Sequence, residues 1–145
     1  MYGFPLNPGI WLCFFIHDLG YIGCEDMDGE EGRLHPWWAY NFLSLFSHKL
    51  AEFCVFHSRF MVEWNNSNFD TKVCISKLGV ADKLAVVYTS LWMYRKAELY
   101  EYMVKDKYSL LYNVGSQVQW KKEVDKKCLD FVNEWKDKAY DIQQY

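Results

Sequence analysis

Several histidine and aspartate residues of this sequence lie among apolar neighbours. His17 and Asp18 directly follow the apolar run at 13–16, His57 lies on an apolar stripe at helical spacing, and Asp82 lies in LGVADKLAVV. A charge in such surroundings is costly to bury unless it is paired or bound to a metal ion. Imidazole nitrogens and carboxylate oxygens together suit a divalent transition metal or a hard ion such as Mg²⁺. These residue types therefore favour a metal site.

Each of these residues also has a simpler interpretation. A His-Asp pair can arise by chance, or because the histidine interacts with a helix C-terminus. A histidine on an apolar stripe is often a hydrogen-bonded core residue. Asp82 can pair with a nearby lysine such as Lys77 or Lys83. The residue types alone leave these alternatives open beside the metal site.

Helices are the elements predicted to position these side chains. The first runs from about residue 9 to 19, after an asparagine and a proline that are typical of a helix start. Residues 20–35, with four glycines and five acidic residues, predict a loop. Pro36 begins the next helix, and residues 50–63 predict a further single helix whose apolar stripe includes His57.

The second half of the chain also predicts helices and contains no convincing pair of strands. Its predicted elements are a turn at 65–70, a helix from Cys74 to about Lys96, a short helix at 97–104 and an amphipathic helix at about 116–139. The predicted fold class is therefore an all-α bundle of about five to seven helices. We expect one domain over residues 1–145, with its core in about 9–104.

Composition limits the class of protein. The chain has 145 residues, of which 51% are hydrophobic and 19% aromatic, which predicts a globular domain and, where aromatic residues are exposed, a homodimer. A net charge of −3 argues against nucleic acid as the main partner. The five scattered cysteines form no C-x-x-C pair, so we expect free thiols and a cytoplasmic protein. No signal peptide is visible and the first apolar run is too short to span a bilayer, so we expect no membrane partner.

Four short pieces of the sequence occur in a meaningful order: HDLGYIG at 17–23, HP at 35–36, HSR at 57–59 and VADKLA at 80–85. In this order they resemble the HD superfamily of metal-dependent phosphohydrolases, in which a His-Asp doublet ends one helix, further histidines follow, and a single aspartate lies on a later, central helix. The first two pieces also resemble the HD-GYP branch of cyclic-dinucleotide phosphodiesterases, although its later His-His-Glu stretch and Gly-Tyr-Pro motif are absent. The resemblance covers about residues 10–100.

The resemblance implies a metal site. His17, Asp18 and Asp82 would hold a first ion, Asp18 would bridge to a second, and His35 and His57 would serve that second ion. The cofactor implied is a divalent metal, one or two ions of Mn, Fe, Mg, Ni or Zn. Such ions polarise a phosphoryl oxygen and lower the pKa of a bound water, which attacks phosphorus.

The resemblance also implies an activity, the hydrolysis of a small phosphorylated molecule, with a nucleotide as the leading candidate. Asp18 and His57 would belong to the catalytic centre. Arg59, two residues after His57, and Lys83, beside Asp82, would hold the phosphate oxygens.

One departure from the family pattern bears on this activity. The family normally places a further histidine on a helix upstream of the doublet, and residues 1–16 contain none. Either the chain starts earlier, or the domain is a shortened form, or the first metal site lacks a ligand. The alternative function is a catalytically impaired HD-fold protein that binds a nucleotide or a protein partner, and a third is a purely structural helical module. The remaining histidine, His48, is expected to be exposed near a helix end.

Overall fold

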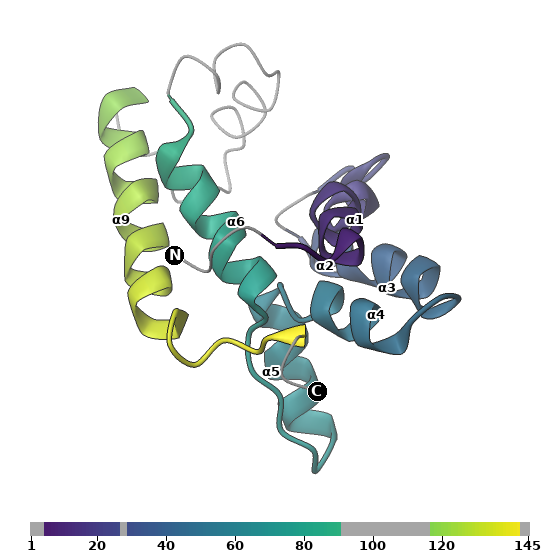
Figure 1. Cartoon of the computed structure of the whole chain (residues 1–145). Helices are drawn as coiled ribbons and strands as arrows, with labels where there is room; N and C mark the ends of the chain where they lie inside the picture. Colours follow the sequence, from purple (N-terminus) through teal and green to yellow (C-terminus); the bar gives the residue numbers. More distant parts are fainter. Residues whose placement is uncertain (1–4, 27–28, 91–116, 143–145) are drawn as a thin grey trace. The chain divides into compact units, whose positions relative to one another are not determined.

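The computed structural model describes residues 5–26, 29–90 and 117–142 (Figure 1). Over these residues the fold is all-α, as predicted, and its one strand-like pairing is an isolated parallel bridge between Ser76 and Tyr140. The chain divides into two compact units, Met1–Val80 with Trp135–Tyr145, and Ala81–Glu134. The single domain over 1–145 stays a prediction. No helix within the described ranges has both the length and the apolar character needed to cross a membrane.

The first unit begins with α1, which spans Pro8–Ile16. The Asn7 side chain caps this helix by accepting a hydrogen bond from the backbone N–H of Gly9 at 2.8 Å. A short 3₁₀ helix, η1, follows at Leu19–Tyr21, and α2 spans Glu30–Arg33. The predicted helix over 9–19 therefore ends before His17. The prediction of a loop over 20–35 is wrong in part, because η1 begins before it and α2 lies within it.

Three helices follow in the first unit: α3 at Pro36–Ser44, α4 at His48–Val55 and α5 at Arg59–Asn68. The prediction of one continuous helix over 50–63 is wrong, because the chain breaks between α4 and α5. Continuation of α4 would need the Cys54 carbonyl to accept the N–H of Ser58. That carbonyl instead accepts both the backbone N–H and the ring Nδ1–H of His57, at 3.2 and 2.6 Å. The hydrogen bonds of His57 thus end α4.

The turn predicted at 65–70 is also partly wrong, because α5 continues to Asn68. Its polar side chains bond back to carbonyls one helical turn earlier, Ser67 Oγ to Glu63 O at 2.8 Å and Asn68 Nδ2 to Trp64 O at 2.7 Å. These local bonds hold the turn-forming residues in helical conformation.

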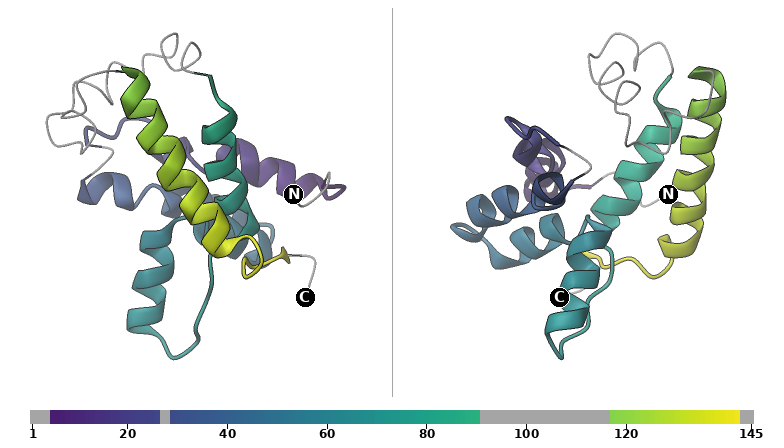
Figure 2. Two further views of the ribbon diagram at one scale, coloured as in Figure 1. Left: turned by 90° about the vertical axis from the view of Figure 1, so that its left-hand side faces the viewer. Right: turned by 180° about the vertical axis from the view of Figure 1, so that it is seen from behind.

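The remaining described helices are α6 at Lys77–Tyr88 and α9 at Gln117–Trp135. Both are shorter than predicted, since α6 starts after Cys74 and α9 ends before residue 139. The helix α6 also ends at Tyr88, and residues 89–90 are not helical, so its predicted continuation is wrong there. The rest of that continuation, at 91–96, the short helix at 97–104 and the start of the last helix at 116 lie outside the described residues. In the second unit, buried Lys121 of α9 donates to the carbonyls of Val86 and Val87 at 3.2 and 3.4 Å, and α6 and α9 lie side by side (Figure 2).

The core of the first unit lies around α4, which packs against both α1 and α3 (Figure 1). Its buried residues come from these three helices, from the start of α6 and from the C-terminal segment: Ile10, Cys13, Ile16, Ala39, Leu43, Ala51, Phe53, Cys54, Leu78 and Ile142. The C-terminal segment is held by backbone bonds from Tyr140 N to Ile75 O at 2.8 Å and from Lys77 N to Tyr140 O at 2.9 Å. This packing brings the ends of α1 and α4 and the start of α3 together.

Candidate metal centre

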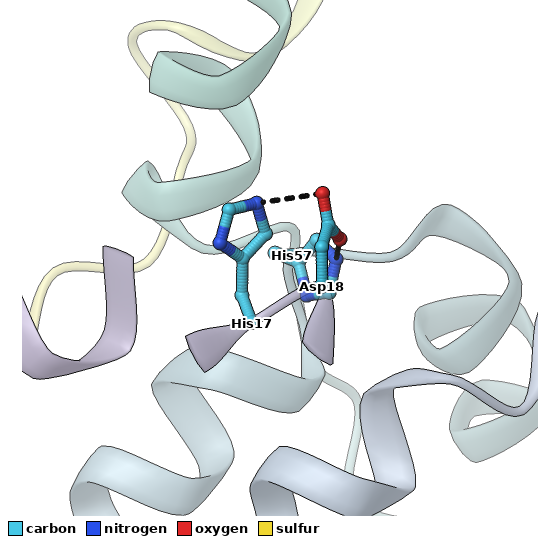
Figure 3. A group of neighbouring side chains, drawn as sticks. All are labelled: His17, Asp18 and His57. Atoms are coloured by element: carbon cyan, nitrogen blue, oxygen red, sulfur yellow. Dashed lines mark ion pairs between the residues drawn. The ribbon is translucent and has the colours of Figure 1, made fainter. Parts of the chain in front are cut away.

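Four of the predicted site residues come together in the first unit, each from a different place in the chain. His17 follows α1, Asp18 precedes η1, His35 precedes α3, and His57 lies in the break between α4 and α5. Figure 3 shows the side chains of His17, Asp18 and His57 gathered in one place, with a dashed line from the His17 ring to the Asp18 carboxylate. One ligand atom from each of these three residues lies within 4.8 Å of the others.

The Nε2 atoms of all three histidines face the Asp18 carboxylate. His17 Nε2 lies 3.2 Å from Asp18 Oδ2, His35 Nε2 lies 3.3 Å from Oδ1, and His57 Nε2 lies 3.5 Å from Oδ1. The Nε2 atoms of His35 and His57 are 3.1 Å apart. Three imidazole nitrogens and a carboxylate therefore converge on one small volume.

The opposite nitrogen of each ring is anchored to a backbone carbonyl three residues earlier in the chain. The bonds join His17 Nδ1 to Phe14 O at 2.8 Å, His35 Nδ1 to Gly32 O at 2.6 Å, and His57 Nδ1 to Cys54 O at 2.6 Å. A carbonyl only accepts hydrogen bonds, so Nδ1 carries the hydrogen and Nε2 of the neutral ring presents a lone pair. Metal-ligating histidines are commonly fixed in this way.

The charge balance of the cluster calls for a cation. Lone pairs on three nitrogens and a carboxylate repel one another unless a proton or a metal ion lies among them. Ligand atoms about 2.1 Å from one ion and about 90 to 110° apart are separated by about 3.0 to 3.4 Å. Three of the separations, 3.1, 3.2 and 3.3 Å, fall in this range, and the fourth, 3.5 Å from His57 Nε2 to Asp18 Oδ1, lies just above it. Imidazole with carboxylate suits Mn, Fe, Ni or Zn better than Mg²⁺, which prefers oxygen ligands.

Burial and charge keep these groups in the forms that bind metals. Partial burial raises the pKa of Asp18, but the three imidazole groups around the carboxylate outweigh this in the metal-free protein and hold the pKa well below its ordinary value. Burial lowers the pKa of His57, which favours the neutral ring. His35 and His57 are buried, whereas half of the Asp18 side chain is exposed. The cluster is thus closed behind the histidines and open to solvent at the carboxylate.

Two glycines allow backbone segments to approach the histidines closely. A Cβ on Gly20 would lie 2.1 Å from the carbonyl oxygen of His35, and one on Gly79 would lie 2.5 Å from that of His57. The ring of Tyr21 also stacks on His35, with centroids 3.8 Å apart and an interplanar angle of 19°. Sequence reasoning assigned these three residues no role. The available signal was a glycine within each of the motifs HDLGYIG and LGVAD.

The remaining predicted residues lie elsewhere or have other partners. Arg59 Nε pairs with Glu63 Oε1 at 2.8 Å on the exposed surface of α5. Asp82 and Lys83 belong to the second unit, where Lys83 Nζ lies 2.8 Å from Asp82 Oδ2. The alternative that Asp82 pairs with Lys83 is confirmed, while the roles of these residues in a metal or phosphate site stay predictions.

His48 is exposed and is the first residue of α4, as expected of a histidine outside the site. The cysteines also agree with expectation, because all five are free thiols.

Comparison with known proteins gave no relative for this chain: no protein-family model matches it, and neither the curated proteins nor the solved structures include a match.

Proposed function

We propose that this protein is a metal-dependent phosphohydrolase of the HD type that acts on a small phosphorylated molecule, with a nucleotide as the leading candidate. The observation that carries the proposal is the convergence of three histidine Nε2 atoms on the Asp18 carboxylate. The order of the motifs that supply these residues supports it. The five free thiols support a cytoplasmic location.

In this proposal the three histidines and Asp18 hold a divalent ion of the Mn, Fe, Ni or Zn class. Such an ion polarises a phosphoryl oxygen and lowers the pKa of a bound water. The carbonyls of Phe14, Gly32 and Cys54 keep the ring lone pairs directed inward. The substrate phosphate approaches from the exposed side of Asp18, where solvent reaches the carboxylate.

Arg59 and Lys83 remain the proposed phosphate-binding residues. Each now pairs with a carboxylate, Arg59 with Glu63 and Lys83 with Asp82. The Arg59–Glu63 pair is exposed, and such pairs contribute only about 0.2 to 1 kcal/mol, so exchanging Glu63 for a phosphate oxygen costs little. Asp82 would likewise have to leave Lys83 to become a metal ligand, and its assignment to the first ion stays a proposal.

The alternative is a protein that keeps the centre but does not hydrolyse phosphate esters. One observation favours it, the pairing of Asp82 with Lys83. A centre with too few ligands binds metal more weakly. In this alternative the protein binds a nucleotide or a protein partner without catalysing a reaction.

The experiment that tests the proposal is elemental analysis of the purified protein after incubation with Mn²⁺, Fe²⁺ or Zn²⁺ and removal of unbound ion. We expect near-stoichiometric metal in the wild type and loss of most of it in His57→Gln, because His57 contributes a buried ring nitrogen to the centre. The matched control is His48→Gln, which changes an exposed histidine of the same helical region and should keep its metal.

A phosphatase screen over nucleotides with the bound metal then separates the two functions. Turnover that disappears in His57→Gln and persists in His48→Gln supports the hydrolase. Stoichiometric metal with no turnover of any nucleotide supports the impaired, ligand-binding protein. A wild type that takes up no metal contradicts both and leaves a helical module whose histidines serve the core.

A further inference from the structure

A second site lies in the first unit, away from the metal centre. It is a pocket of about 500 Å³, a size within the range of small-molecule sites. Its walls come from α4, from the segment before α6 and from the C-terminal segment: Lys49, Glu52, Phe56, Lys72, Val73, Cys74, Lys138, Ala139 and Tyr140. All of these residues belong to the first unit, so the pocket is complete within it.

The pocket and the metal centre use different sides of α4. Lys49, Glu52 and Phe56 follow one another at i, i+3 and i+7, which places them on one face. Cys54, whose carbonyl holds the ring of His57, lies two residues from Glu52 and thus about 200° around the helix. Groups bound in the pocket therefore lie against α4 on the side facing away from the histidines.

The charges of the pocket favour an anion. Three lysines line it against a single carboxylate, Glu52. Lys49 lies in the first turn of α4, where the helix dipole favours a nearby anion. The ammonium of Lys72 donates hydrogen bonds to the carbonyls of Asn66 and Phe69 at 2.5 and 3.2 Å. These bonds hold the ammonium in place before a ligand binds.

The pocket also presents two aromatic side chains, Phe56 and Tyr140, both half-buried. Tyr140 is held firmly, because its backbone bonds to Ile75 and Lys77 and its ring lies 6.3 Å from that of Phe53. Aromatic walls beside ammonium groups recognise a ligand that joins a flat ring to an anionic group.

We infer that this pocket binds a phosphate monoester that carries one aromatic ring and has the size of a mononucleotide. The lysines hold the phosphate, Phe56 and Tyr140 contact the ring, and Glu52 accepts hydrogen bonds from hydroxyl groups between them. The inference goes beyond the proposed function, because the pocket holds no histidine and needs no metal or reaction.

The test is calorimetric titration of the EDTA-treated protein with AMP as the probe, so that metal-dependent binding at the histidine centre does not contribute. We expect saturable binding that weakens about tenfold in Lys49→Gln and in Lys138→Gln, since each substitution removes one charge-assisted contact. Both lysines are exposed, so their removal should leave the thermal unfolding midpoint unchanged. Lys126→Gln, an exposed lysine of α9 outside the pocket, is the matched control and should bind AMP like the wild type.

Adenosine and inorganic phosphate divide the recognition into its two parts. We expect each to bind more weakly than AMP, and AMP binding to weaken as salt screens the lysines. Adenosine that binds as tightly as AMP would overturn phosphate recognition by the lysines. The inference is also overturned by a wild type that shows no saturable binding at millimolar AMP, or by lysine variants that bind AMP as tightly as the Lys126→Gln control.

Discussion

Two aspartates of this chain lie in similar apolar sequence surroundings and yet have different partners. Asp18 is approached by imidazole rings from three separate places in the first unit. Asp82, in the second unit, is paired with the ammonium of Lys83, the next residue along the chain. The charge of Asp82 is thus compensated by a local neighbour. Among the residues that the structure describes, Asp18 pairs only with histidines, whose neutral rings supply lone pairs rather than charge.

The difference indicates which of the two aspartates needs a bound cation. A carboxylate next to a lysine can form an ion pair with that lysine, so its presence in an apolar stretch does not require a metal ion. A carboxylate facing three ring nitrogens, each with its hydrogen on the far side, is balanced only by protons or by a cation. The comparison therefore favours Asp18 over Asp82 as the residue on which metal binding depends.

The largest expected effect comes from exchanging each aspartate for asparagine. Asp18→Asn should lower metal affinity by more than about 100-fold, because loss of a direct ligand exceeds the 10- to 100-fold effect of an outer hydrogen-bond partner. Asp82→Asn should lower it less. Titration with Mn²⁺ followed by elemental analysis measures both. An equal loss of metal affinity in the two variants would contradict this difference and show that Asp82 is as important for metal binding as Asp18.

A smaller effect is expected where backbone packing positions the histidines. Gly79→Ala places a Cβ against the His57 carbonyl oxygen, 2.5 Å away in the present geometry. We expect it to destabilise the fold by about 1 to 3 kcal/mol, the range for overpacking, and to weaken metal binding as His57 shifts. The matched control is Gly9→Ala, whose Cβ meets side-chain atoms instead of backbone: the movable end of Leu50 at 2.7 and 2.9 Å and Asn7 Oδ1 at 3.1 Å.

Urea unfolding and metal titration of the two glycine variants provide the measurement. Equal stability and equal metal affinity in Gly79→Ala and Gly9→Ala would show that the start of α6 does not position His57. A loss of metal affinity restricted to Gly79→Ala would extend the centre to the packing behind His57.

The smallest expected effect is the pH dependence of stability in the metal-free protein. Burial lowers the folded-state pKa of His57 below its ordinary value of 6.5, so below this pH the unfolded chain binds more protons than the folded one. Stability should therefore fall as the pH decreases through about 6.5, by up to about 1.4 kcal/mol per pH unit. Asp18 acts in the same direction at lower pH, because its lowered pKa contributes stability that is present above its ordinary value of 3.8 and lost on acidification.

Urea unfolding between pH 7.5 and 5.5 in EDTA checks this expectation. His57→Gln should flatten the pH dependence, whereas His48→Gln, at an exposed position, should leave it unchanged. An unchanged slope in His57→Gln would mean that His57 binds a proton in the folded protein as readily as in the unfolded chain.

Much of the helical fold follows from local patterns. Asn7 with Pro8, and Pro36, are signals that act within one helical turn, and the helices begin where these residues predict. The break at residues 56–58 was missed, because periodicity continues through it. The break depends on the hydrogen bond from the His57 ring to the Cys54 carbonyl, which replaces a helical hydrogen bond. The rest of the first unit buries this ring, so the bond depends on the tertiary structure.

The sequence by itself determined the candidate ligands and their order, the His-Asp doublet followed by two later histidines. It also determined where the neighbouring helices start. Only the tertiary structure decided that His17, His35 and His57 share one carboxylate, and that Gly20 and Gly79 lie against their backbones. It also placed Lys49, Lys72 and Lys138 around one pocket. The physical reason is range: capping and helical periodicity act between neighbours, whereas convergence on Asp18 depends on how α1, α3 and α4 pack around a common core.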